Sequence, residues 1–181
     1  MSRKYAVTRF VGYIAMSLDG FIATPDGGVA WLDPFNAAMS DGGDDGGYGD
    51  FIKGVDALVM GRPTYDQVMG WGWPYEDRPG YVLSHRKDFS GDHIAAAGNI
   101  DTLRRAIAKD GHETVWIMGG GETQRAALDA GLFHSLRVFI MPVVLGGGRP
   151  LFTTGLTRNL TLTASSARPG GILDLTYDIK D

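Results

Sequence analysis

The chain has 181 residues, 44% of them hydrophobic, with 17 basic and 21 acidic side chains, and this predicts one globular domain over residues 1–181. The acidic balance, without a stripe of Lys or Arg, excludes a dedicated nucleic-acid binder, and no apolar stretch approaches the roughly 20 residues that span a bilayer. The absence of cysteine excludes disulfides, thiolate nucleophiles and Cys-bound metal clusters, and without a signal-peptide core at the N-terminus we expect a cytoplasmic protein.

The first third of the chain predicts one strand and one short helix. Residues 11–16 form an apolar run that indicates a strand, which ends at the turn 17–20. Residues 41–50 are rich in Gly and Asp, and we expect a mobile surface segment there. Residues 48–55 carry apolar side chains on one side of a short helix.

The middle of the chain alternates strands with helices. The expected strands are 57–60, 81–83 and 114–118, all continuous apolar runs of the kind that is covered on both faces. The expected helical segments are 64–69, 101–109 and 122–130. Asp101 is the expected N-cap of the second helix, and Gly111 is its expected stop.

The last third of the chain predicts antiparallel structure. Residues 138–145 indicate a strand in which Pro142 marks a bulge or an edge. Residues 160–164 and 173–180 alternate apolar and polar side chains around a Pro-Gly-Gly turn, which predicts a hairpin with one wet face. The whole order predicts an α/β domain with a mixed, mostly parallel sheet.

Two glycine-rich turns follow buried strands, at 60–65 and 118–123. Ligands gather at the carboxyl ends of parallel strands, and glycines there let backbone N–H groups approach phosphates. Thr64 and Thr123 add hydroxyl donors and Arg62 adds a cation, so the pair of turns suits the pyrophosphate of a dinucleotide. The alternative is that these glycines only shape strand-to-helix turns. Neither turn is a Walker loop or a Rossmann fingerprint.

A third polar segment, Ser84-His85-Arg86-Lys87, follows the strand at 81–83. Its hydroxyl, imidazole and guanidinium groups suit a phosphomonoester such as the 2′-phosphate of NADPH, and a solvated basic turn is the alternative. The glycine run 146–148 either packs closely on a cofactor or bends the edge of the sheet, and we favour the structural role. The four histidines show no metal-ligand spacing and the acidic segment lacks the EF-hand pattern, so we expect no metal.

Five segments occur in the order of a known superfamily: 17–23, 55–65, 82–84, 118–121 and 142–152. Together they resemble the dihydrofolate reductase-like superfamily, and in particular the C-terminal reductase domain of the bifunctional riboflavin-biosynthesis deaminase/reductase and its stand-alone relatives. The resemblance implies a three-layer fold with a mixed sheet of about eight strands. It also implies NADPH as hydride donor, a small heterocyclic substrate, and a homodimer.

The resemblance implies cofactor-binding residues by position. Ala15 and Ile22 would line the nicotinamide end, and Ser84, His85 and Arg86 would lie near the 2′-phosphate. The pyrophosphate and ribose region would contact Gly61, Arg62, Thr64, Gly119, Gly120, Gly121, Glu122 and Thr123. The implied catalytic residues are Asp19 and Trp31, beside the nicotinamide and substrate, and Asp33, the nearest carboxylate to the one that binds pteridine in dihydrofolate reductases.

The substrate is less well defined, because the chain departs from both relatives. Asp33-Pro34 is an unusual context for the pteridine-binding carboxylate, and residues 71–75 (Trp-Gly-Trp-Pro-Tyr) replace the Asp-Asp-Pro stretch of the riboflavin enzymes. We expect a reductase for a pterin or aminopyrimidine, with 5-amino-6-(5-phosphoribosylamino)uracil as one candidate. Trp31, Trp71, Trp73 and Tyr75 either stack on the substrate or belong to the core. The alternatives are a non-catalytic nucleotide-binding or sensor module and a flavin-using reductase.

Overall fold

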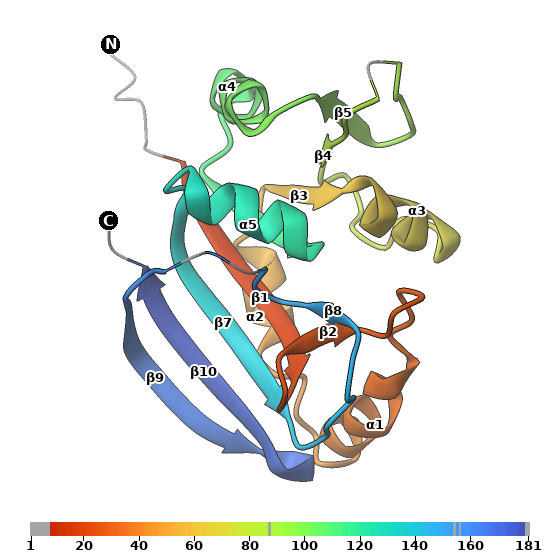
Figure 1. Cartoon of the computed structure of the whole chain (residues 1–181), viewed down its shortest axis with the longest axis vertical. Coiled ribbons are helices and arrows are strands. Elements are labelled where there is room, and N and C mark those ends of the chain that lie inside the picture. The colour runs from red at the N-terminus through yellow and green to blue at the C-terminus, as the bar shows by residue number, and fades with distance from the viewer. Residues whose placement is uncertain (1–7, 87, 154, 156, 180–181) are drawn as a thin grey trace.

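The computed structural model describes residues 8–86, 88–153, 155 and 157–179. These residues form an eight-stranded sheet with helices around it and a separate two-stranded ribbon (Figure 1). In spatial order the sheet strands are β5 (Ile94–Ala97), β4 (Gly80–Leu83), β3 (Ala57–Gly61), β6 (Thr114–Gly119), β1 (Arg9–Ser17), β7 (Phe133–Met141), β10 (Ile172–Ile179) and β9 (Leu160–Arg168).

The sheet is mixed and mostly parallel. All neighbouring strands from β5 across to β7 run parallel, whereas β10 runs antiparallel to β7 and to β9. This confirms the predicted sheet and its C-terminal antiparallel hairpin, of which Lys180 lies outside the described residues. The ribbon pairs β2 (Phe21–Ala23) with β8 (Arg149–Pro150), which joins two segments far apart in the sequence.

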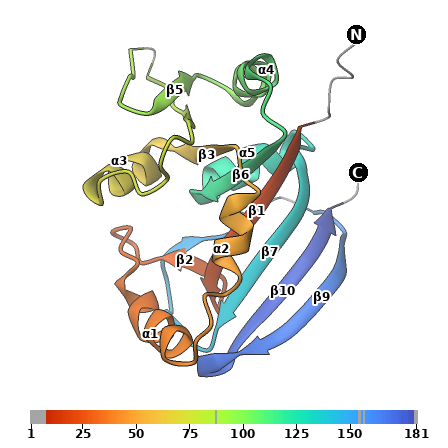
Figure 2. The same ribbon diagram turned by 180° about the vertical axis from the view of Figure 1, so that it is seen from behind.

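Helices cover both faces of the parallel part of the sheet, as the front and back views show (Figures 1 and 2). The helices are α1 (Asp33–Asp41), α2 (Tyr48–Lys53), α3 (Arg62–Gly70), α4 (Ile100–Asp110) and α5 (Gly121–Asp129), with short 3₁₀ turns at Ala30–Leu32 and Pro169–Gly171. The buried apolar side chains of α4 and α5 belong to one cluster. Those of α3 belong to another, against which partly buried side chains of α2 pack. The predicted three-layer arrangement is therefore present.

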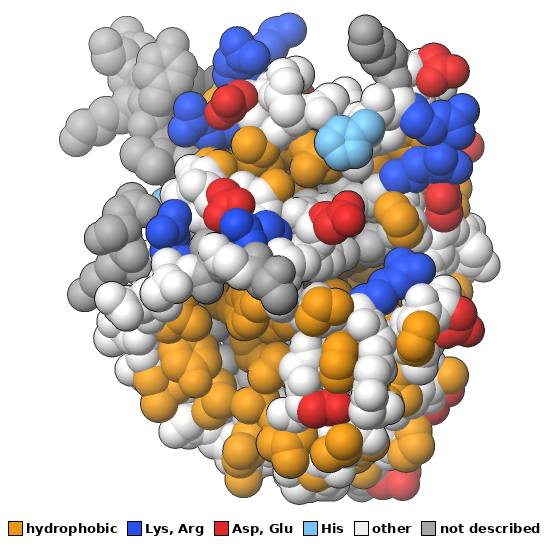
Figure 3. Space-filling model, viewed as in Figure 1, with side chains coloured by type: hydrophobic (Ala, Val, Ile, Leu, Met, Phe, Trp, Pro, Cys, Tyr) orange, Lys and Arg blue, Asp and Glu red, His pale blue; other side chains and the backbone are white. Residues whose placement is uncertain are grey.

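The C-terminal hairpin differs from the prediction of one wet face. Residues 160–167 of β9 are all exposed, so neither face of this strand is covered. Figure 3 shows hydrophobic side chains on the surface over the hairpin, where Leu160, Leu162 and Leu173 are exposed.

Strand β3 shows why a continuous apolar run forms a central strand. Ala57 and Val59 pack into the α4–α5 cluster, whereas Leu58 and Met60 pack into the α2–α3 cluster. Alternate side chains point to opposite faces of a strand, so a strand covered on both faces needs apolar residues at every position. All five residues of β3 are buried.

The start of α4 differs from the prediction. Helix α4 begins at Ile100, and the Asn99 side chain accepts a hydrogen bond from the Thr102 N–H at 2.8 Å. Asp101 is therefore a first-turn residue, and its assignment as the N-cap is wrong. Gly111 ends the helix with a left-handed φ of 80°, as predicted.

The prediction around Pro142 is also wrong. Strand β7 starts at Phe133 and ends at Met141, so Pro142 lies beyond it. β7 is an interior strand between β1 and β10, which explains the exclusion of proline, since every N–H of an interior strand is needed for the sheet.

The Gly- and Asp-rich segment 41–50 has specific partners, although it is expected to be mobile. Asp44 accepts the Gly46 N–H at 2.8 Å, and Asp45 accepts the N–H groups of Gly47 and Gly49. Arg168 ties the segment to the C-terminal hairpin, with its Nη1 2.9 Å from Asp44 Oδ2.

Asp174 on β10 connects Arg168 to Arg137 on β7. The Arg137 guanidinium binds both carboxylate oxygens, at 2.9 and 2.7 Å, and Arg168 Nη2 lies 2.7 Å from Oδ2. Asp174 is 5% exposed. Burial raises the pKa of its carboxyl, but the hydrogen bonds from the two arginines outweigh burial, so the pKa lies below its usual range.

Within the described ranges, no helix has the length and apolar character needed to cross a membrane.

Candidate functional site

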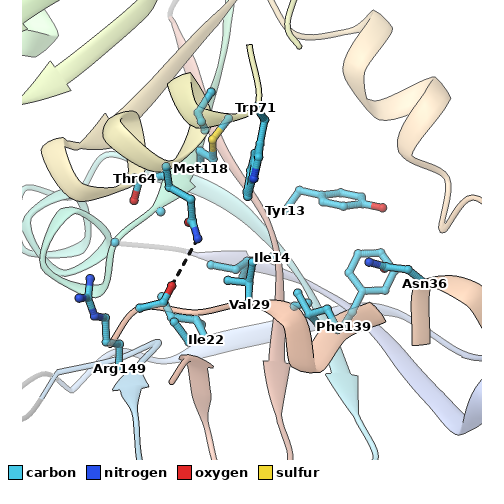
Figure 4. Close-up of a pocket in the computed structure, with 18 of the residues that line it drawn as sticks. Tyr13, Ile14, Ile22, Val29, Asn36, Thr64, Trp71, Met118, Phe139 and Arg149 are labelled. Carbon is cyan, nitrogen blue, oxygen red and sulfur yellow. Dashed lines mark hydrogen bonds between the residues drawn. The ribbon is translucent and has the colours of Figure 1, made fainter. Parts of the chain in front are cut away.

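A cavity of about 920 Å³ opens at the carboxyl ends of the parallel strands. Its floor is formed by the ends of β1, β6 and β7, and its walls come from α1, α3, the ribbon strand β2 and the loops that follow them. Figure 4 shows Thr64 and Arg149 at one end, and Tyr13, Phe139 and Asn36 at the other. We call these the phosphate end and the aromatic end.

The phosphate end is formed by two strand-to-helix turns. Gly119, Gly120 and Gly121 line the cavity where β6 leads into α5, and Thr64 lines it from the first turn of α3. Gly120 has a φ of 72°, which side-chain-bearing residues rarely adopt. A methyl group on Gly120 would lie 3.6 Å from Thr64 Oγ1 and 3.7 Å from Thr123 Oγ1. Two hydroxyls thus converge on bare backbone at a helix N-terminus, a setting that favours anions.

A hydrogen bond closes the cavity on the side of α3. Gln67 Nε2 donates to the Gly27 carbonyl at 3.3 Å, the bond drawn as a dashed line in Figure 4. A side-chain carbon placed on Gly27 would lie 3.0 Å from the Arg149 guanidinium carbon. The Arg149 side chain therefore packs against the loop that contains Gly27. The loop is held further by the Thr24 N–H, which donates to the Gly28 carbonyl at 3.0 Å.

The aromatic end is a wall of rings in mutual contact. The Tyr13 ring lies 4.8 Å from Phe139 and 6.1 Å from Trp116, and Trp116 lies 5.9 Å from Tyr75, measured between centroids. Tyr48 continues the wall, 6.2 Å from Trp116. Such tilted and edge-on contacts are the stable geometry for aromatic pairs. The result is a rigid apolar surface of the kind that accepts a planar ring.

Burial raises the pKa of Tyr13 and of Tyr75 to about 12. Both phenols therefore keep their protons at neutral pH. Tyr13 Oη donates to the Gly46 carbonyl at 3.2 Å, so its proton is already engaged in positioning the 41–50 segment.

A model of the RibD C-terminal domain family matches residues 11–173. This chain belongs to that family. A relative from Bacillus subtilis (strain 168), the uncharacterized protein YwjB, is 34% identical over 144 residues, which cover 77% of this chain and 80% of that protein.

Solved structures support the fold of this RibD C-terminal domain. A protein from Shewanella sp. PV-4 whose name refers to riboflavin biosynthesis matches with a TM-score of 0.82 at 27% identity, over 96% of this chain and 100% of that one. Dihydrofolate reductase from Enterococcus faecalis, complexed with NADP(H), matches with a TM-score of 0.66 at 17% identity, over 96% of this chain and 97% of that one. At that identity the likeness shows the fold alone. The family match and the Shewanella structure, taken together with it, confirm the expected dihydrofolate reductase-like superfamily and the reductase-type fold.

Six of the predicted cofactor residues of this RibD C-terminal domain line the cavity: Ala15, Ile22, Thr64, Gly119, Gly120 and Gly121. Thr123 is 3% exposed and lies beneath Gly120. Gly61 lies beside Thr123 Oγ1, and neither it nor Glu122 lines the cavity. The two glycine turns, predicted separately, therefore meet.

Arg62 is not among the residues that line the cavity. Its Nε lies 3.5 Å from Asp66 Oδ2 without a well-aligned hydrogen bond, and its guanidinium carbon lies 5.5 Å from the centre of the Phe89 ring. Its predicted contact with the pyrophosphate would need a different side-chain conformation.

Ser84, His85 and Arg86 lie at the end of β4, one strand beyond β3, and do not line the cavity. Ser84 Oγ accepts the Arg86 N–H at 3.2 Å, which forms a tight turn. The Arg86 side chain is 60% exposed, and its Nε lies 3.9 Å from Asp88 Oδ1. Lys87 lies outside the described residues.

The three predicted catalytic residues do not line the cavity, and their roles stay predictions. Asp19 is exposed and accepts hydrogen bonds from Ser17 Oγ at 2.6 Å and from the N–H groups of Leu145 and Gly146. The hydrogen bond from Ser17 lowers the pKa of Asp19 most. Asp33 is exposed at the start of α1, and Trp31 is half-buried against the Phe139 cluster.

The tryptophans 71 and 73 have different environments. Trp71 is 59% exposed and lines the cavity mouth, where Figure 4 shows it pointing inward. Trp73 is buried and stacks on His93, with 5.2 Å between ring centroids, so it belongs to the core.

Sequence reasoning missed Gln67, Arg149 and most of the aromatic end, because no local motif marks residues that meet only in the fold. Among the described residues, no group of three or more acidic or His side chains has the arrangement of a metal site.

Proposed function

We propose that this RibD C-terminal domain is an NADPH-dependent reductase that transfers a hydride to a small heterocycle of pterin or aminopyrimidine type. The observation that carries the proposal is the phosphate end, where Gly120 leaves bare backbone close to the Thr64 and Thr123 hydroxyls. The family and the reductase-type fold support the same reaction class.

The residues present fit the diphosphate of NADPH. The first N–H groups of α5 have no partner within the helix and carry the positive end of its dipole. Thr64 would donate a further hydrogen bond and Arg149 would supply the nearby cation. Ala15 and Ile22 would contact the nicotinamide, and Ser84, His85 and Arg86 would contact the 2′-phosphate at the end of β4.

Bound NADPH supplies the hydride, and the protein supplies position and exclusion of water. The aromatic end would hold the substrate ring in line with the floor at Ala15. Trp71 and the bond from Gln67 to Gly27 restrict access of water from the side of α3. Proton delivery by Asp19, Asp33 or water stays a prediction.

Titration with NADPH and NADH, followed by nicotinamide fluorescence, tests the cofactor. We expect micromolar binding of NADPH and weaker binding of NADH. Absence of NADPH binding at micromolar concentration refutes the proposal.

Arg86→Ala tests the 2′-phosphate contact. We expect NADPH affinity to fall about tenfold and NADH affinity to stay unchanged, because only NADPH carries the phosphate. Arg104→Ala, an exposed arginine on α4, is the matched control and should change neither. Equal losses for both nucleotides would remove Arg86 from this role.

Turnover separates the enzyme from its alternatives. Oxidation of NADPH with at least one member of a panel of pterins and aminopyrimidines is expected. Tight NADPH binding without oxidation across the panel would favour the sensor module, and purification of a yellow protein would favour the flavin-using reductase. The homodimer stays a prediction. Size-exclusion chromatography with light scattering tests it.

A further inference from the structure

The charged side chains that line the cavity are mostly acidic. Among the described residues its lining contains four carboxylates, those of Asp26, Asp44, Asp45 and Asp66, and one cation, Arg149. Figure 4 shows Arg149 at the phosphate end, the same end as Thr64 and away from Asn36. The described lining of the aromatic end therefore contains no Lys or Arg.

Two of the carboxylates belong to the aromatic end. Asp44 and Asp45 precede Gly46, whose added side-chain carbon would lie 3.0 Å from Tyr13 Oη. Both line the cavity together with Asn36, Ser40 and Tyr48. The hydrogen bond from Arg168 lowers the pKa of Asp44, and the Gly49 and Gly47 N–H groups lower that of Asp45, so both are ionised at neutral pH.

Two arginines stand behind this wall, and neither lines the cavity. The Arg137 guanidinium carbon lies 5.5 Å from the Tyr13 ring centre and 5.1 Å from that of Phe139. Asp174 binds Arg137 through two hydrogen bonds and also binds Arg168, whose remaining contacts go to Asp44. Together, Asp44, Asp45 and Asp174 carry three negative charges against the two positive charges of Arg137 and Arg168. The wall therefore keeps a net negative charge, and neither guanidinium is offered to a ligand in the cavity.

We infer that the substrate is a planar aromatic heterocycle that carries an amino or cationic group toward Asp44 and Asp45 and that carries no phosphate. The inference rests on the proposed reductase function and concerns its substrate. Aromatic faces attract cations, and a desolvated phosphate needs Arg, Lys or helix N–H groups as partners. Here two carboxylates stand where a phosphate on the substrate would need such donors, so the phosphoribosyl aminopyrimidine is a poor fit.

Matched pairs of probes test this directly. Pyridoxamine and pyridoxamine 5′-phosphate differ only in the phosphate, and 4-aminoquinoline and quinoline differ in an amino group that makes the first a cation at neutral pH. Isothermal titration calorimetry is run on the full chain saturated with NADP⁺ and on the free chain. With NADP⁺ present, we expect pyridoxamine to bind about tenfold more tightly than its phosphate, and 4-aminoquinoline about tenfold more tightly than quinoline.

A charge-installing variant makes the test specific to this end of the cavity. Asn36→Arg should narrow the preference for pyridoxamine over its phosphate about tenfold. Asn159→Arg, at an exposed position outside the cavity, adds the same charge and should leave the preference unchanged.

Three results would overturn the inference: equal or tighter binding of the phosphate, equal binding of the quinolines, or the same effect from both variants. If NADPH binds while the phosphorylated probe is preferred, the inference fails and the reductase proposal stands. If NADPH does not bind, the reductase proposal fails, and the quinoline pair, which carries no phosphate, still decides the preference of the aromatic end on the free chain.

Discussion

Replacing Gly61 with alanine tests how closely the two glycine turns pack. Gly61 has φ −79° and ψ 161°, which any residue adopts, so the substitution adds no backbone strain. The new methyl carbon would lie 2.8 Å from Thr123 Oγ1, and Thr123 is almost fully buried. Overpacking of this kind costs about 2 kcal/mol, which lowers the melting temperature of a domain of this size by about 4–8 °C.

A double-mutant cycle identifies the contact responsible. Thr123→Ala removes the crowded hydroxyl, so the double variant should lose about 1–2 kcal/mol less than the sum of the two single losses. Urea unfolding followed by circular dichroism gives the free energies. Gly98→Ala is the control, because a methyl group there meets no atom within 4 Å.

Two results would refute this reasoning. Gly61→Ala could unfold at the urea midpoint of the wild-type protein, which would mean that the two turns move apart without a loss of stability. Alternatively the double variant could lose the full sum, which would place the crowding elsewhere than between Gly61 and Thr123.

Three further outcomes follow from individual contacts. Asn99→Ala should cost about 1 kcal/mol of unfolding free energy because it removes the N-cap, whereas Asp101→Ala should cost only a few tenths; equal losses in urea unfolding would contradict the cap assignment. The pKa of Asp174 is depressed in the folded protein. Its contribution to the free energy of unfolding is therefore complete above the unfolded pKa of about 3.9 and is lost as the pH falls through the lower folded pKa. Asp174→Asn should therefore destabilise the protein at pH 7 by about 3 kcal/mol and flatten the dependence of its stability on acid pH. An unchanged acid-unfolding curve would show that the ion pairs of Asp174 do not cause the loss of stability in acid. Gly148→Ala places a methyl group against the Ala23 carbonyl oxygen with φ at 149°, and should cost about 3 kcal/mol or more in thermal unfolding; a wild-type melting temperature would show that the ribbon adjusts.

Strands buried on both faces were predictable because each leaves a strong local signal. β3 and β6 are continuous apolar runs that end at glycine, and both lie within a residue of their expected limits. β5 has a weaker pattern, Ile followed by three alanines of which two are exposed, and the sequence did not indicate it. Helix α1 also lacks a marked apolar face, since none of its residues is buried.

The aromatic end could not be predicted for a different reason. Tyr13, Tyr48 and Phe139 come from segments separated by many residues, and no spacing rule relates them. The same holds for Asp44 and Arg168, which are 124 residues apart. Such groups are brought together by strand order, and strand order is set by long-range packing that a single sequence does not display.

Strand order also explains why two independent glycine turns form one site. β3 and β6 are adjacent and parallel, so Gly61 and Gly119 end at the same edge. From there α3 packs onto one face of the sheet and α5 onto the other. Neighbouring strands whose connections leave on opposite faces create a crevice at that edge, which is where α/β proteins bind ligands. The bare backbone at Gly120 lies in this crevice, so its position follows from topology. The N–H and hydroxyl groups that the two helix starts contribute are the reason why we propose it as the diphosphate site.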